Sequence, residues 1–196
     1  VISITDEVGS TATFTELDSG IYILFNYQLT TGSTYDLEVI NGDESITASS
    51  ILHPKIEIDS LYFVEDEFGG PPSEETLYNA RILFQDPGGV PNYYREVLTV
   101  NDTLHRVFRV ANDDLTDGNQ RDLGYFQRRV REGDFVEIEL WMIDQAGFNY
   151  FNTLNDIASA SGFASATPYN PISNLSGGLG NFTVYHRSEV SGTVTP

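Results

Sequence analysis

Cysteine is absent from this chain of 196 residues. Disulfides, thiolate metal sites and thiol catalysis are therefore excluded, and stability must come from a packed core. Basic residues are also scarce, since ten Lys and Arg stand against 29 Asp and Glu and give a formal charge of −19. Such a surface repels a phosphate backbone, so we expect no nucleic acid partner.

Long apolar runs are missing as well. No segment approaches the length of about 20 apolar residues that a membrane-spanning helix needs, and no charged leader precedes Val1. Because residues 1–5 already have the pattern of a strand, we expect the chain to begin inside a domain, with any leader or anchor removed.

Aromatic residues and short alternating segments are abundant. The 12 Phe and 11 Tyr are too many for a disordered chain and indicate a folded, sheet-based protein. Tyr35, Leu37 and Val39 share one face of a predicted strand, and Asn41-Gly42 after them predicts a tight hairpin. The fold class predicted is mostly β.

A domain boundary is predicted at His53-Pro54, because proline cannot join a central ladder. Residues 1–54 are interpreted as a partial N-terminal immunoglobulin-like or transthyretin-like β region. Residues 55–196 are interpreted as a larger antiparallel β-sandwich with one short helix. Within it, the alternation from Phe135 to Ile143 is the clearest strand.

The one helix is predicted from apolar residues at Tyr150, Phe151, Leu154, Ile157 and Ala158. It should begin near Asp144 or Gln145 and stop before Gly162. After an irregular loop, Asn181 to Tyr185 is predicted as the final strand.

Asp113, Asp114 and Asp117 cluster around a glycine and are weak candidates for a calcium site. A calcium loop wants ligands at alternate positions and a late bidentate Glu, but counting from Asp113 the third position is Leu115 and the twelfth is Gly124. An ordinary acidic turn is therefore favoured, and neither a metal nor a cofactor is predicted.

No catalytic residues are predicted either. Glu137 and Glu139 share one face of a strand and could in principle hydrolyse glycosides, but strand alternation with a solvated face already explains them. The three histidines, His53, His105 and His186, form no metal-binding spacing, although a site assembled in space stays open.

Arginines are concentrated in one quarter of the chain, at Arg106, Arg109, Arg121, Arg128, Arg129 and Arg131. The favoured interpretation is bidentate pairing with neighbouring carboxylates such as Asp113, Asp122, Glu132 and Asp134. The alternative is a patch for an anionic ligand or a partner, for which Arg128 and Arg129 are the candidates.

Two long loops, Glu65 to Glu75 and Ser161 to Gly180, are rich in breakers and predict partner or ligand contact. The second carries Phe163 and Tyr169, aromatic groups that commonly anchor interfaces. An equally acceptable interpretation is that these rings pin the loop onto the sheet.

Four groups of segments, in order along nearly the whole chain, carry a family resemblance. They are Gly20 to Tyr22 with Gly32 to Val39 and Thr47-Ala48; Phe84 to Pro87 with Asn92 to Arg95; Asp113 to Gly118 with Gly133-Asp134; and Pro171 to Leu175 with Gly177 to Phe182. Together they resemble the Bacteroidota outer-membrane lipoprotein family catalogued as domain of unknown function 4249.

The resemblance implies a lipid-anchored protein of the cell outer membrane, facing the periplasm or the surface, whose leader, lipidated cysteine and first strands lie outside this chain. It also implies an accessory role beside a TonB-dependent transporter in nutrient capture, with an unknown small molecule or glycan as ligand. It supplies no catalytic residues.

We therefore expect a non-enzymatic accessory or ligand-binding protein. The rival classes are a structural or adhesive surface module and, less favoured, a glycan-active enzyme. An enzyme should show converging carboxylates in a pocket, and an adhesin a flat patch with a polar rim.

Overall fold

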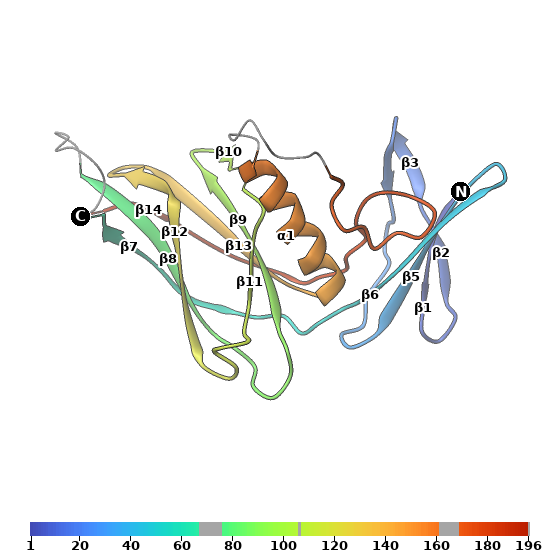
Figure 1. Cartoon of the computed structure of the whole chain (residues 1–196), viewed down its shortest axis with the longest axis horizontal. Coiled ribbons are helices and arrows are strands. Elements are labelled where there is room, and N and C mark those ends of the chain that lie inside the picture. The colour runs from blue at the N-terminus through green and yellow to red at the C-terminus, as the bar shows by residue number, and fades with distance from the viewer. Residues whose placement is uncertain (67–75, 106, 161–168, 196) are drawn as a thin grey trace. The chain divides into compact units, whose positions relative to one another are not determined.

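The computed structural model describes residues 1–66, 76–105, 107–160 and 169–195 (Figure 1). Within this part of the chain strands dominate, many of them pair in antiparallel fashion, and one helix is present. The predicted fold class is confirmed. Among the described residues, no helix is long and apolar enough to cross a bilayer.

The chain divides into two compact units. Unit 1 combines Val1–Pro54 with Ile143–His186, and unit 2 combines Lys55–Met142 with Arg187–Pro196. A boundary after Pro54 is common to this division and to the one predicted from sequence, but residues 143–186, predicted to lie in the C-terminal domain, are part of unit 1. These residues belong to unit 1 because Phe182 and Val184 pack against its N-terminal strands.

Unit 1 contains two sheets and the helix. Its strands are β1 (Ile2–Asp6), β2 (Thr11–Thr13), β3 (Thr15–Asp18), β4 (Ile21–Ile23), β5 (Thr34–Asn41) and β6 (Glu44–Ile51). One sheet has the order β2-β1-β5-β6, and β3 pairs with β4 alone. The predicted hairpin at Asn41-Gly42 is confirmed, since Asn41 pairs with Glu44 and Gly42 has a φ of 62°.

Helix α1 (Gln145–Ala160) begins where its cap was predicted. The Gly147 amide donates to Asp144 Oδ1 at 2.7 Å, which satisfies one of the free donors of the first turn. The other oxygen of Asp144 accepts from Ser50 Oγ of β6 at 2.5 Å, and that hydroxyl accepts from the Val184 amide at 3.1 Å. One carboxylate therefore joins three segments of unit 1.

The prediction of a strand at Asn181 to Tyr185 is wrong. Asn174 instead clamps the backbone of Phe182, donating from Nδ2 to its carbonyl at 2.6 Å and accepting from its amide at 2.9 Å. A side chain thus replaces the neighbouring strand as hydrogen-bond partner. The last strand, β14 (Arg187–Thr193), begins further along and belongs to unit 2.

Unit 2 is built from two sheets. Its other strands are β7 (Ile58–Glu65), β8 (Leu77–Gln85), β9 (Tyr93–Val100), β10 (Thr103–Leu104), β11 (Arg109–Asn112), β12 (Gln120–Arg131) and β13 (Phe135–Ile143). One sheet has the order β12-β8-β7, and the other has β10-β9-β13-β14 with β11 also pairing with β9.

The inner faces of these sheets make one core. Phe84 of β8 and Tyr94 of β9 meet edge to face, with ring centroids 5.0 Å apart. Val136, Ile138 and Leu140 of β13 are buried in the same cluster, as the alternation of that strand predicted. The arrangement is a β-sandwich, and its interior positions the ionisable groups that follow.

Candidate functional site

A glutamate lies on the core face of the sandwich. Strand β9 alternates so that Tyr94, Glu96, Leu98 and Val100 all point inward, and Glu96 is only 1% exposed. Three of these side chains are apolar or aromatic, so Glu96 breaks the row. A buried carboxylate is costly unless it is paired, which makes its surroundings the first place to look for chemistry.

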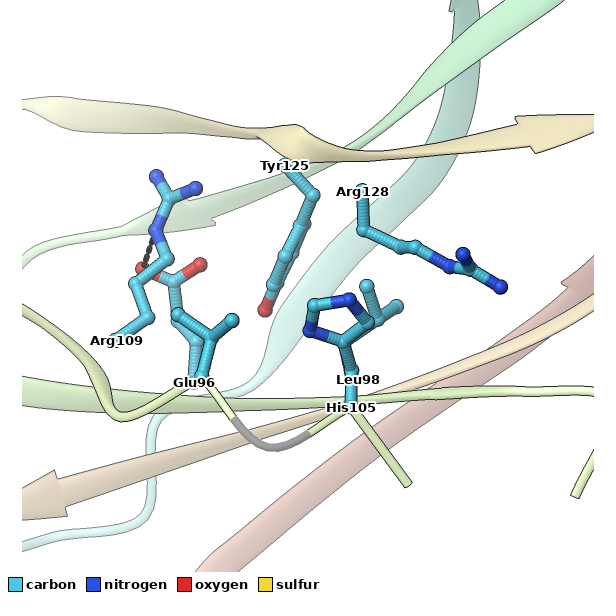
Figure 2. Close-up of a pocket in the computed structure, with 7 residues that line it drawn as sticks. Glu96, Leu98, His105, Arg109, Tyr125 and Arg128 are labelled. Atoms are coloured by element: carbon cyan, nitrogen blue, oxygen red, sulfur yellow. Dashed lines mark ion pairs between the residues drawn. The ribbon is translucent and has the colours of Figure 1, made fainter. Parts of the chain in front are cut away.

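Arg109 and Tyr125 surround the Glu96 carboxylate (Figure 2). Arg109 stands directly opposite Glu96 in the β11–β9 ladder, and its Nε lies 3.2 Å from Glu96 Oε1. Tyr125 comes from the irregular part of β12, where the register with β8 shifts between Gly124 and Arg129. The guanidinium of Arg109 also lies over the Tyr125 ring, 5.0 Å from its centroid. These three residues are called the Glu96 cluster below.

The electrostatics of the Glu96 cluster are set by burial. Desolvation raises the pKa of Glu96 above its ordinary range, while the charge of Arg109 acts in the opposite direction. Burial and the neighbouring Glu96 charge likewise raise the pKa of Tyr125. The hydroxyl of Tyr125 faces the carboxylate without a well-formed hydrogen bond, and both Glu96 oxygens lack such a bond within the described chain.

The space beside the Glu96 cluster is small. The cavity is about 20 Å³ and is further lined by Leu98, His105, Val107 and Arg128. A volume of this size admits about one water molecule and no metabolite. Burial, with a smaller effect of Arg128, lowers the pKa of His105. The geometry suits a hydrated, structural ion pair better than a substrate site.

The arginines are held largely by other partners than the predicted ones. Arg129 forms an ion pair with Asp66, and Arg121 donates to the Asn112 carbonyl at 2.8 Å. Arg128, a predicted contact residue, is exposed at the rim of the small cavity. Of the carboxylates named from sequence, Asp122 does pair with an arginine, but with Arg81, at 2.9 Å.

The predicted contact residues do not gather in one unit. Tyr169 is 53% exposed and belongs to unit 1, whereas Arg128 and Arg129 belong to unit 2. Phe163 lies outside the described residues, as do Arg106 and most of the loop predicted after Glu65.

Of the two glutamates on the outer face of β13, Glu139 is engaged by neighbouring side chains. Glu139 accepts from Trp141 Nε1 at 2.8 Å and from Arg187 Nη1 at 3.1 Å. Glu137 and Glu139 line a hollow of about 270 Å³ with Glu189, and Arg187 also pairs with Glu189 at 3.1 Å. A carboxylate committed to an arginine and an indole is poorly placed to carry a proton in a reaction.

Two turns of unit 2 bring three aspartates together. Asp86 follows β8, and Asp113 and Asp117 lie in the turn between β11 and β12. One carboxylate oxygen from each of the three lies within 4.8 Å of the others. Asp114 is not part of this group, and its Oδ2 accepts from Asn112 Nδ2 at 2.6 Å. Asp86, Asp113 and Asp117 are called the aspartate cluster below.

The two turns are joined by hydrogen bonds from backbone amides to aspartate side chains and by a contact between two glycines. The Gly118 amide donates to Asp86 Oδ2 at 2.8 Å, and the Gly89 amide donates to Asp117 Oδ1 at 2.8 Å. A Cβ atom on Gly88 would lie 3.2 Å from the Gly118 Cα, so the two backbones touch where both residues are glycine. The aspartate cluster is therefore held in place by contacts between the two turns of the sandwich.

A family model matches residues 1–191, which is almost the entire chain, and its description is Domain of unknown function (DUF4249). The chain belongs to the DUF4249 family. Neither the curated proteins nor the solved structures contain a match to it.

Sequence reasoning missed two functional candidates of this DUF4249 chain. Glu96 could have been found, because it interrupts the apolar row of Tyr94, Leu98 and Val100 in a clear alternation. Asp86 gave no such signal, since an aspartate before Pro87 is ordinary turn chemistry and its distance in sequence from Asp113 hides the contact.

Proposed function

We propose that this DUF4249 protein is a non-enzymatic accessory or ligand-binding lipoprotein of the outer membrane that works beside a TonB-dependent transporter in nutrient capture. The cellular setting comes from the family resemblance set out in the sequence analysis. The observation that carries a binding role is an apolar surface on unit 1.

That surface is the β3–β4 hairpin. Leu17, Ile21, Tyr22 and Phe25 all expose more than two fifths of their area, with Leu17 the most exposed at 65%. A hairpin of two strands with its apolar side chains in water is at best marginally stable by itself. Exposed apolar and aromatic groups in one segment are typical of protein interfaces. A partner covering them would stabilise both molecules.

The ionisable groups of unit 2 support the non-enzymatic part of the proposal. Glu96 is engaged with Arg109 beside a cavity too small for a metabolite. Glu139 is held by Trp141 and Arg187. Glu96 faces no substrate-sized pocket, and Glu139, although it lines the hollow of about 270 Å³, is already engaged by two neighbouring side chains.

Affinity capture from outer membranes tests the proposal. The tagged, lipid-anchored full-length protein is solubilised in detergent, and co-purifying proteins are identified by mass spectrometry. We expect a TonB-dependent transporter, and we expect the double variant Leu17→Ser/Tyr22→Ser to reduce its recovery about tenfold or more, since interface aromatic residues dominate binding.

The control is Val8→Ser, another exposed apolar residue of unit 1, at 81% exposure in the turn after β1. It should leave recovery unchanged, and all variants should keep the wild-type Tm. Recovery of a transporter that is insensitive to the hairpin substitutions would reject the hairpin as the contact. Absence of any transporter, or release of reducing sugar from a polysaccharide, would favour the adhesive or the glycan-active alternative.

A further inference from the structure

The aspartate cluster contains a buried oxygen that the protein leaves unsatisfied. Asp113 is only 2% exposed, and its Oδ2 has no hydrogen-bond partner within the described chain. Asn92 is 1% exposed and also lacks partners for both polar side-chain atoms. It precedes Tyr93, which pairs with Asn112 of β11. Buried polar groups without partners are rare in native proteins and commonly mark a bound ion or water.

The charge of the cluster is not neutralised by the protein. In the part of the chain that the structure describes, no ion pair joins Asp86, Asp113 or Asp117 to a basic side chain. Arg121 is nearby, with its guanidinium 5.9 Å from the Tyr94 ring centroid, but it donates to a backbone carbonyl. Three carboxylates so close together repel one another unless a cation lies between them.

Tyr94 holds one of the cluster's carboxylates in place. Its hydroxyl, at a position fully buried in the core, donates to Asp86 Oδ1. A buried hydroxyl that donates to a candidate ligand fixes the orientation of that carboxylate.

The cluster opens to solvent through a hollow. Asp113 and Asp117 line a space of about 310 Å³ together with Gly89, Val90, Pro91 and Asp114. This space admits an ion that keeps several of its waters. Cluster oxygens within 4.8 Å of one another fit around a single Ca²⁺, because ligands at about 2.3–2.6 Å can be up to about 5 Å apart. Mg²⁺ suits the cluster less well, because it demands near-octahedral geometry and is usually held by one or two carboxylates and its own waters.

We propose that Asp86, Asp113 and Asp117 bind one calcium ion that ties the turn after β8 to the turn between β11 and β12. Asp86 and Asp113 supply buried oxygens, Asp117 supplies an exposed one, and water from the hollow completes the shell. This inference differs from the metal-free expectation from sequence, and it is independent of the transporter proposal. The linear calcium loop does not describe such a site, because one proposed ligand comes from a separate turn.

Calorimetric titration with CaCl₂ tests the site, using the chelator-treated full chain at about 0.15 M NaCl so that diffuse attraction to the acidic surface is screened. Asp117→Asn is the test variant, since it is exposed and its amide oxygen can still accept from Gly89. Asp114→Asn is the matched control, because it removes the same charge from the same hollow without touching the cluster.

Calcium should bind the wild type with a stoichiometry of one and raise its Tm by about 5–10 °C at a free concentration near 100 Kd. Asp117→Asn should weaken binding about tenfold or more, and Asp114→Asn by less than about threefold, because ligand charge sets calcium affinity. Equal weakening by both variants would show diffuse attraction and overturn the site. Equal affinity for MgCl₂, or no heat and no Tm change with calcium, would also overturn the proposal.

Discussion

Replacing Arg109, the positively charged partner of Glu96, is the most informative perturbation of unit 2. Arg109→Met keeps an unbranched side chain but leaves the carboxylate buried without its charge partner. The glutamate can escape this state by taking up a proton. From its ordinary pKa of 4.5, protonation at pH 7 costs about 1.4 kcal/mol per unit, or about 3.4 kcal/mol in all. This ceiling agrees with the about 3–5 kcal/mol typical of a broken buried pair.

The expected loss depends on pH with a definite sign. The folded pKa of Glu96 is already raised by burial, and removing Arg109 raises it further because that charge favours ionisation. The folded variant then binds more protons than the unfolded chain between pH 4.5 and its raised pKa, so its free energy of unfolding falls as pH rises. We expect the free energy of unfolding of the variant to be about 2–3 kcal/mol below that of the wild type at pH 7. At pH 5 the part of this difference that depends on pH should be under about 1 kcal/mol.

Urea unfolding followed by tryptophan fluorescence reports on unit 2, where the loss is expected. The reason is that Trp141, the only tryptophan of the chain, lies on β13 of unit 2. Arg128→Met is the control, an exposed arginine at the rim of the same cavity, and should change stability by less than about 0.5 kcal/mol. Adding Glu96→Gln to Arg109→Met should recover part of the loss. An equal loss at both pH values would show that the loss does not come from the ionisation of Glu96.

Two local contacts of unit 1 give further tests. Asp144→Ala removes the cap on the Gly147 amide and should cost about 1–2 kcal/mol in chemical unfolding, whereas Asp144→Asn, which keeps the acceptor oxygen, should lose less; equal losses would argue against capping. Gly177→Ala should destabilise more than Gly9→Ala in thermal unfolding. Both glycines have φ near 85–88°, but only at Gly177 would the new Cβ lie 2.5 Å from the Ser45 carbonyl oxygen. Equal Tm values for these two variants would contradict the clash.

Features of the fold that depend on neighbouring residues were predictable from sequence. The hairpin at Asn41-Gly42 and the start of α1 at Asp144 follow from turn and capping chemistry within a few positions. The false strand at Asn181 to Tyr185 shows the limit. Its alternation is real, but the Asn174 side chain, 8 residues before Phe182, takes the backbone hydrogen bonds that a strand would use, and no periodic pattern marks this contact.

Only part of the candidate site could be predicted from the sequence, for the same reason. Asp113 and Asp117 were recognised as acidic turn residues, but their third partner Asp86 is brought in by the packing of two turns through Gly88 and Gly118. Glycine against glycine at a crossing leaves no periodic pattern in the sequence. Contacts of this kind emerge only when both sheets of the sandwich are in place.

The proposed calcium ion would lie where two turns of unit 2 converge. Crystals of the chain grown in CaCl₂, with diffraction recorded at a long wavelength, reveal such an ion through the anomalous signal of calcium. We expect one peak with oxygens of Asp86, Asp113 and Asp117 at about 2.3–2.6 Å. A map with no peak there, or with Arg121 turned to neutralise the three carboxylates, would contradict it.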